Sequence, residues 1–143
     1  MKIFLDTADT DLIRKYHGTG LIDGVTTNPT LIMRSGRDPE DVYQEIQDIG
    51  LRDISMEVMG DSNTMIEEGI RLATKFPNSA TIKVPCTPDG LLACAELSCK
   101  NLIRVNVTLI FDVAQAILAA KAGAAYVSPF VGRLDDNLSL IHI

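Results

Sequence analysis

The chain has 143 residues, 46% of them apolar and 22% charged, which is typical of one soluble globular domain. Its net charge of -6 argues against non-specific nucleic-acid binding, which needs a basic surface. Residues 1–6 reach an aspartate too early for a secretory signal, and no apolar run approaches the roughly 18 residues of a membrane span, so we expect a cytoplasmic protein with neither membrane nor nucleic-acid partners.

Short apolar runs rich in β-branched residues predict six strands. They cover residues 2–6, 23–27, 53–58, 80–84, 102–107 and 124–128. Helix signals lie between these runs. Asp38 followed by Pro39 is typical of a helix start, and Gly50 lies where a helix-ending glycine is expected. Thr87 followed by Pro88 repeats the start signal. Further apolar faces with helical spacing lie at residues 66–73 and 113–120.

The order of these elements is strand, helix, strand throughout, with no hairpin turn signal. It predicts a parallel sheet with right-handed crossovers, either an open doubly wound sheet or a closed barrel. A nucleotide-binding open sheet has a glycine-rich turn after its first strand. Residues 6–11 contain no glycine, and a Walker-type lysine motif is absent from the sequence.

A polar residue lies at or near the carboxyl end of every predicted strand. These residues are Asp6, Thr26 with Asn28, Glu57, Lys83, Asn106 and Ser128. In a (β/α)8 barrel the carboxyl ends of the strands surround one mouth, where catalytic groups collect. The pattern therefore favours the barrel and predicts a site at its mouth.

Lys83 interrupts a run, residues 80–84, that otherwise reads as a buried strand. One interpretation is an edge-strand lysine that discourages aggregation. The other is an amine nucleophile, which needs a partly desolvated position because burial disfavours the ammonium form.

The other polar positions also allow two interpretations each. Asp6 is either the N-cap of a helix that starts near Ala8 or a general acid/base. Glu57 is compatible with a surface charge and Asn28 with a turn residue. Arg133 is either solvated or a phosphate ligand, which suits the forked guanidinium.

The cysteines number three and lack C-x-x-C spacing, which argues against a disulfide framework or a zinc site. Among them, Cys86 is assigned to packing, because Lys83 is the better nucleophile and no histidine lies close in sequence. His17 and His142 are isolated, whereas metal sites cluster their ligands. We expect neither a metal nor a cofactor.

Six segments, in this order, resemble the strand-end motifs of the transaldolase family, in the short form shared with fructose-6-phosphate aldolases. They are "FLDTAD", "GVTTNPTLI", "SMEVMG", "TIKVPCTPDGL", "VNVTLIF" and "SPFVGRLDD". The resemblance implies a TIM (β/α)8 barrel and a metal-free class I aldol mechanism. It ends near Asp136, so we expect residues 1–137 to form a partial catalytic barrel and residues 138–143 to be a non-matching tail.

The resemblance also implies a role for each strand-end residue. Lys83 matches the Schiff-base lysine, and Asp6 matches the general acid/base. Glu57 and Thr108 match the pair that orients a catalytic water. The matches to substrate-binding positions are Thr26, Asn28, Asn106, Ser128, Phe130 and Arg133, the last of them on the phosphate.

The implied function is that of a transaldolase of the pentose phosphate pathway, which moves a dihydroxyacetone unit from a ketose phosphate to an aldose phosphate. A homo-oligomer is expected at full length. The alternatives are a fructose-6-phosphate aldolase and a non-catalytic partial fragment. Glu57 and Phe130 favour transfer, since the aldolase branch resembles glutamine and tyrosine at these positions. The marked residues recur about every 24 positions, so eight units need about 195 residues, and we expect the 143-residue chain to be a poor enzyme.

Overall fold

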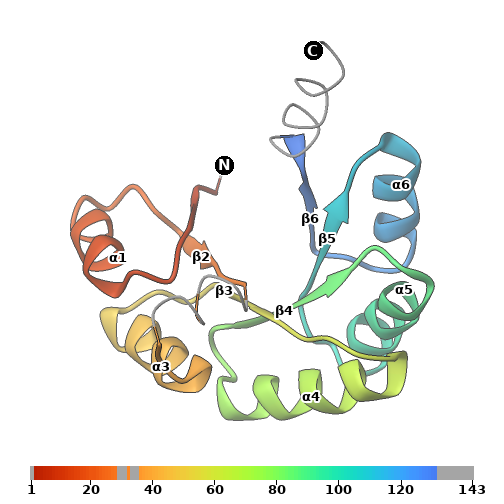
Figure 1. Ribbon diagram of the computed structural model, residues 1–143, viewed down its shortest axis with the longest axis horizontal. Coiled ribbons are helices and arrows are strands. Elements are labelled where there is room, and N and C mark those ends of the chain that lie inside the picture. Colours follow the sequence, from red (N-terminus) through yellow and green to blue (C-terminus); the bar gives the residue numbers. More distant parts are fainter. Residues whose placement is uncertain (1, 29–31, 33–35, 132–143) are drawn as a thin grey trace. The chain divides into compact units, whose positions relative to one another are not determined.

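The computed structural model describes residues 2–28, 32 and 36–131 of the chain (Figure 1). Strands and helices alternate along these residues, as the sequence predicts. In chain order they are β1 (Phe4–Asp6), α1 (Thr10–His17), β2 (Gly24–Thr26), α3 (Pro39–Ile49), β3 (Ile54–Glu57), α4 (Ser62–Lys75), β4 (Ala80–Pro85), α5 (Pro88–Ala95), the π-helical turn η1 (Glu96–Lys100), β5 (Val105–Ile110), α6 (Val113–Lys121) and β6 (Tyr126–Pro129).

The strands form one sheet in the order β1-β2-β3-β4-β5-β6, which is also their order in the sequence. The pairs β1–β2, β2–β3 and β5–β6 are parallel. Successive parallel strands joined by helices are the repeating unit of a (β/α)8 barrel, whereas a doubly wound sheet departs from sequence order. The predicted fold class is therefore confirmed, with the first six βα units present.

The described chain divides into two compact units. The first contains Met1–Val58 and Arg71–Ile82, and thus β1 to β3 with α1 and α3. The second contains Met59–Ile70 and the chain from Lys83 onward, and thus α5, β5, α6 and β6. In the described part of the chain, no helix combines the length and apolarity needed to cross a bilayer.

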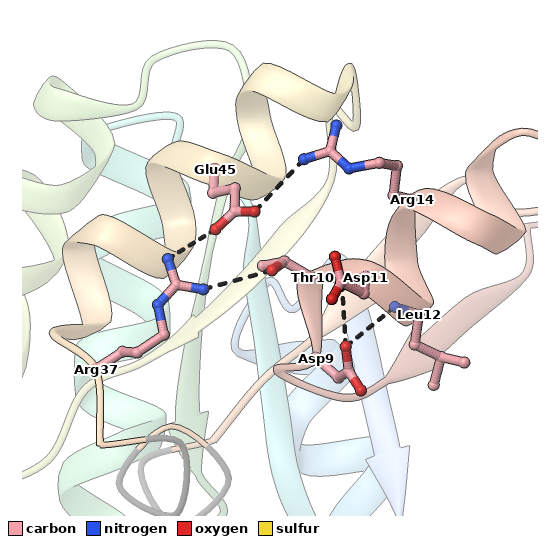
Figure 2. Close-up of polar contacts among 7 residues, drawn as sticks. All are labelled: Asp9, Thr10, Asp11, Leu12, Arg14, Arg37 and Glu45. Atoms are coloured by element: carbon pink, nitrogen blue, oxygen red, sulfur yellow. Dashed lines mark hydrogen bonds and ion pairs between the residues drawn. The ribbon is translucent and has the colours of Figure 1, made fainter.

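In the first unit, α1 begins after Asp9, whose carboxylate accepts hydrogen bonds from the N–H groups of Asp11 and Leu12, both at 3.0 Å (Figure 2). The helix therefore starts two residues later than the sequence suggested. Asp6 belongs to strand β1 instead, so its interpretation as the N-cap is wrong.

Side-chain ion pairs join α1 to α3 on the surface of the same unit (Figure 2). The Glu45 carboxylate binds Arg37 at 2.7 Å and Arg14 at 3.4 Å. Arg37 also donates to the Thr10 hydroxyl at 3.4 Å. The hydrogen bond from Arg37, followed by one from Thr10, lowers the pKa of Glu45 below its usual value of 4.5.

A buried carboxylate lies just before β3. Asp53 is 2% exposed, and it accepts a hydrogen bond from the Thr81 hydroxyl at 2.7 Å. Lys2 binds its second oxygen at 3.1 Å. A carboxylate is found in such a place only when it is paired or hydrogen-bonded. The apolar core around it includes Ile13, Val25, Ile46, Ile54, Phe76 and Ile82.

In the second unit, local capping sets both helix starts. Thr87 accepts from the Gly90 N–H at 3.1 Å, as its sequence signal predicts. Asp112 and Gln115 form a reciprocal capping box at the start of α6.

The fifth strand differs from the sequence prediction, because it begins at Val105 rather than at residue 102 and continues to Ile110. Leu102 has a φ of 55° and is 88% exposed, so its backbone belongs to the turn after η1 rather than to a strand.

Candidate functional site

The first unit brings Asp6 and Thr26 together. Both residues end their strands and are paired in the register of β1 with β2. The Thr26 hydroxyl donates to Asp6 Oδ1 at 2.8 Å. Asp6 is exposed, so this carboxylate is held in one orientation while it remains accessible to a reactant.

The other two predicted residues of this unit lie at neighbouring strand ends. Glu57 is the last residue of β3 and is half-buried. Asn28 follows β2 and is half-buried, and its backbone carbonyl accepts from the Ile32 N–H at 3.2 Å.

The second unit holds Lys83, which is 5% exposed and lies in β4. On one side, the Cys86 N–H donates to the Thr108 carbonyl at 2.8 Å and joins the end of β4 to β5. Within the first unit, the Ile54 N–H donates to the Ser79 carbonyl at 2.8 Å and joins β3 to the start of β4. Because β4 is hydrogen-bonded on both sides, the edge-strand interpretation of Lys83 is wrong.

Asn106 and Ser128 are joined across β5 and β6. The Ser128 hydroxyl donates to Asn106 Oδ1 at 2.9 Å. Asn106 is 2% exposed, and this bond fixes which end of its amide faces Ser128. The predicted strand-end amide is therefore buried and oriented.

Thr108 carries an unsatisfied group. The residue is 1% exposed, and its Oγ1 has no hydrogen-bond partner among the described residues. A buried hydroxyl without a partner is costly, so such a group calls for an explanation, and a bound water or ligand is one.

A β-bulge follows Thr108 and was not predicted from the sequence. Val107 is paired with Val127, but the next aligned pair is Ile110 with Pro129, so β5 has one more residue than β6 in this interval. Leu109 lies within the bulge at a φ of 59°, in the left-handed region that a leucine rarely adopts.

Two aromatic rings meet beyond the bulge. The rings of Phe111 and Phe130 are edge-to-face, with centroids 5.8 Å apart and planes at 67°. They line a pocket of about 260 Å³ together with apolar neighbours such as Ile110, Val113 and Pro129. This ring pair places the predicted substrate-binding residue Phe130 in an apolar wall.

Cys86 follows the last residue of β4 and is half-buried. Burial, followed by the negative charge of Asp112, raises the pKa of its thiol. A thiol that stays protonated is a poor nucleophile, which agrees with its assignment to packing. Among the described residues, no three His, Cys, Asp or Glu side chains lie close enough to hold a metal ion. Arg133, His142 and residues 138–143 lie outside the described residues.

Each unit thus supplies a different set of reactive groups. The first has a hydroxyl-bound carboxylate, with a second carboxylate at a neighbouring strand end. The second has a buried amine, an oriented amide and an unsatisfied hydroxyl. An amine of this kind can form an imine with a carbonyl, and a carboxylate can exchange protons with a hydroxyl group.

A family model and the curated relatives place this chain in the same protein family. A model of the Transaldolase/Fructose-6-phosphate aldolase family matches residues 3–141. A probable transaldolase of Nitrosopumilus maritimus (strain SCM1) is 52% identical over 137 residues, which are 95% of this chain and 61% of that protein. A probable transaldolase of Geobacter sulfurreducens is 57% identical over 137 residues, 95% of this chain and 63% of that protein. The chain thus spans less than two thirds of the length of these relatives.

Solved structures add information on the fold. The carboxyl transferase domain of Rhizobium etli pyruvate carboxylase, solved with pyruvate, aligns at a TM-score of 0.59 with 13% identity. The alignment covers 96% of this chain and 30% of the other. At this identity the likeness concerns the fold alone.

Proposed function

Because the chain belongs to the transaldolase/fructose-6-phosphate aldolase family, we propose that it carries the catalytic strands of a class I transaldolase of the pentose phosphate pathway. Such an enzyme transfers a dihydroxyacetone unit from a ketose phosphate to an aldose phosphate. The observation that carries the proposal is the position of Lys83, a buried amine inside a strand that is hydrogen-bonded on both sides.

In the proposed reaction, Lys83 attacks the C2 carbonyl of the ketose phosphate, and loss of water gives an iminium ion. The positive charge of the iminium draws the electrons of the C3–C4 bond. Asp6 removes the proton of the C4 hydroxyl, the bond breaks, and an aldose phosphate leaves. The enamine that remains on Lys83 adds to a second aldose phosphate, and hydrolysis releases the new ketose phosphate.

Other side chains support these steps. The hydrogen bond from Thr26 keeps the Asp6 carboxylate in one orientation. Thr108 has an unsatisfied buried hydroxyl that suits the water of imine formation and hydrolysis, and Glu57 is its proposed partner in that role.

The remaining positions are assigned to substrate binding. Asn28 and Asn106 are proposed to bind the dihydroxyacetone portion, and the bond from Ser128 keeps the Asn106 amide in place. Phe130 is assigned to the wall of the site, and Arg133 to the phosphate. A homo-oligomer at full length is part of the same proposal.

Trapping by borohydride tests the proposal directly. The chain is incubated with fructose 6-phosphate and sodium borohydride, digested and mapped by mass spectrometry. We expect a reduced three-carbon adduct on Lys83 and none in Lys83→Ala. Lys121→Ala, which removes an exposed lysine of α6, is the matched control and should keep the adduct. A label that persists at the same level in Lys83→Ala would reject the assignment.

The choice between transfer and simple aldol release is tested separately. Glu57 and Phe130 favour transfer, because a carboxylate cannot donate a hydrogen bond to water as an amide does, and a phenyl ring cannot donate one as tyrosine does. Fructose 6-phosphate is assayed alone and with an acceptor aldose phosphate. Release of dihydroxyacetone without acceptor at the same rate would support a fructose-6-phosphate aldolase instead. Formation of the Lys83 adduct without any turnover would support a non-catalytic fragment.

A further inference from the structure

Gly90 has no room for a side chain. It is buried in the first turn of α5, and a Cβ atom placed on it would lie 1.9 Å from the carbonyl oxygen of Pro85. Real Cβ atoms essentially never approach a neighbouring atom within 3.0 Å. The neighbour here is backbone, which cannot rotate away as a flexible side chain can. Only glycine therefore allows α5 to begin this close to the end of β4.

Thr87 fastens the same contact from within the turn. Its N–H donates to the Pro85 carbonyl at 2.9 Å, and its hydroxyl oxygen accepts from the Gly90 N–H at 3.1 Å. Its own carbonyl accepts from the Leu91 N–H at 2.9 Å. The end of β4 is thus tied to the first turn of α5 by a short chain of hydrogen bonds through Thr87.

The end of β4 is also fixed on its other side. Cys86, the residue after Pro85, donates its N–H to the Thr108 carbonyl at 2.8 Å. Lys83 lies two residues before Pro85, so both side chains belong to the same face of β4. A displacement of Pro85 is therefore transmitted to the face that carries Lys83. It also reaches the backbone of Thr108, whose buried hydroxyl is unsatisfied.

The far end of α5 is anchored and leaves the helix little freedom to move instead. Cys94 and Leu97 are both 0% exposed. The turn η1 continues the helix, and the Ser98 hydroxyl within it donates to the Ala122 carbonyl at 3.2 Å. Because the interior is closely packed, a methyl group added at Gly90 should displace the end of the strand rather than the whole helix.

We propose that Thr87 and Gly90 are positioning residues, which hold the end of β4 where Lys83 attacks the substrate carbonyl. The inference rests on the proposed function, in which that attack starts the reaction. A Cβ at position 90 requires the turn and the Pro85 carbonyl to separate by about 1 Å, and a misplacement of this size can cost about 100-fold in rate.

The rate of imine formation tests this role. The 143-residue chain is mixed rapidly with saturating fructose 6-phosphate and quenched with borohydride at successive times. Mass spectrometry gives the total adduct on Lys83, three-carbon and six-carbon forms together. The rate constant reports positioning, and the amplitude reports the fraction of chains that are folded. A merely structural role for Gly90 would lower the amplitude and the unfolding temperature but leave the rate constant unchanged.

Gly90→Ala should lower the rate constant about ten- to 100-fold. The half-saturating concentration of fructose 6-phosphate should stay within about threefold, because the residues assigned to binding lie outside α5 and β4. Gly24→Ala is the matched control. A Cβ at Gly24, the first residue of β2, would lie 2.4 Å from the Asp53 carbonyl oxygen. This variant should unfold at a lower temperature and keep the wild-type rate constant.

Thr87→Ala and Thr87→Ser test the same contact without added bulk, and they decide the question if Gly90→Ala does not fold. Loss of the hydroxyl frees the Gly90 N–H and loosens the first turn of α5. We expect the rate constant to fall about fivefold in Thr87→Ala. Thr87→Ser keeps the hydroxyl and should stay within about twofold of wild type.

The results separate the positioning role from the proposed function. A Lys83 adduct that forms at the wild-type rate in Gly90→Ala and in Thr87→Ala would overturn the positioning role and leave the proposed function standing. A loss as large in Gly24→Ala, or in Thr87→Ser, would assign the effect to general destabilisation and overturn it as well. The absence of any Lys83 adduct in the wild-type chain would reject the proposed function, and the positioning role with it.

Discussion

Thr26 donates its hydroxyl hydrogen to Asp6 Oδ1 at 2.8 Å, across two parallel strands whose register pairs the same two residues. Both backbones are fixed by the sheet, so the bond needs little further ordering of either side chain. A carboxylate held in this way presents its second oxygen in a constant direction. In the proposed reaction that orientation is needed when Asp6 removes the proton of the C4 hydroxyl.

Replacement of Thr26 by Val should slow carbon–carbon cleavage about tenfold, because the Asp6 carboxylate loses its orienting donor while the shape of the side chain is kept. Thr26→Ser retains the hydroxyl and should recover most of the rate. Both variants should still be trapped by borohydride at Lys83, and in Thr26→Val a larger share of the adduct should carry the uncleaved six-carbon sugar phosphate. Single-turnover release of the aldose phosphate measures the effect. Equal rates in Thr26→Val and Thr26→Ser would show that the hydrogen bond is not used.

Replacement of Asp6 by Ala should slow cleavage by roughly 10²–10⁴-fold, the usual contribution of a general acid/base. Borohydride should still trap an adduct at Lys83, now with the whole six-carbon sugar phosphate in place of the three-carbon unit, because imine formation precedes the step assigned to Asp6. The comparison of trapped adduct with released aldose phosphate separates the two steps. Asp9→Ala, which removes the helix cap beside it, is the control for loss of a nearby carboxylate. Full cleavage activity in Asp6→Ala would remove its proposed role.

The strands and two of the helix starts could be predicted from the sequence, because each follows a local rule. Apolar runs mark the strands, and a cap followed by proline marks the start of α3 and α5. The same rules failed at α1, where Asp6 and Asp9 both precede the helix and only the structure shows which one caps it. Two carboxylates three residues apart look equivalent in a sequence, since either can accept from free N–H groups.

The pH dependence of stability should reveal the ion pairs of Glu45. Its folded-state pKa lies below the ordinary 4.5, chiefly through the hydrogen bond from Arg37. A lowered pKa gives stability that is fully present above the unfolded-state value and is lost as pH falls through the folded-state value. The free energy of unfolding of wild type should therefore exceed that of Glu45→Gln by up to about 1 kcal/mol at pH 6. This difference should vanish in strong acid.

Urea unfolding of both proteins at a series of pH values measures this difference. Glu67→Gln, which removes one exposed charge from α4, is the control for net charge. Added salt should reduce the Glu45 effect, because the groups that bind it are partly exposed. A difference that grows as the pH falls would contradict the assigned sign.

The buried carboxylate of Asp53 should contribute more to the free energy of unfolding than Lys2, its exposed ion-pair partner. Asp53→Ala leaves the buried Thr81 hydroxyl without its acceptor, and we expect a loss of about 2–3 kcal/mol in the free energy of unfolding. Lys2→Ala should cost less than about 1 kcal/mol, because the lysine side chain is 52% exposed. Urea unfolding provides both losses from the shifts of the midpoint, provided that the dependence of the unfolding free energy on urea concentration is the same in all three proteins. Equal losses in the two variants would mean that the ion pair, rather than the buried hydrogen bond, stabilises this region.

The apolar surface of α6 should make the 143-residue chain self-associate. Val113, Ile117 and Leu118 are 75%, 62% and 53% exposed on this one helix. Ile117→Lys should shift the size-exclusion profile toward the monomer. Leu21→Lys, at a residue 68% exposed in another unit of the chain, is the matched control and should leave the profile unchanged. A wild-type chain that elutes as a monomer at all concentrations would contradict the expectation.

The site itself could be predicted from the sequence only as a set of residue types at strand ends. The partners of these residues depend on register, which no local pattern fixes. The bond from Ser128 to Asn106 follows from the pairing of β5 with β6. The bulge at Leu109 was not foreseen, because leucine disfavours a positive φ and the sequence around it reads as an uninterrupted strand. Where tertiary contacts override local preference, the sequence gives no warning.

The strand order has a consequence for how the chain folds. Among the described strands, each one from β2 to β6 lies beside the strand that precedes it in the sequence, so the pairing from β1 to β6 joins neighbouring parts of the chain. Loops of this length close at a modest entropic cost, and proteins rich in short-range contacts fold faster than those with distant pairings. During synthesis, each strand that leaves the ribosome finds the preceding strand already available. The sheet can therefore grow in one direction, from β1 toward β6, at the pace of translation.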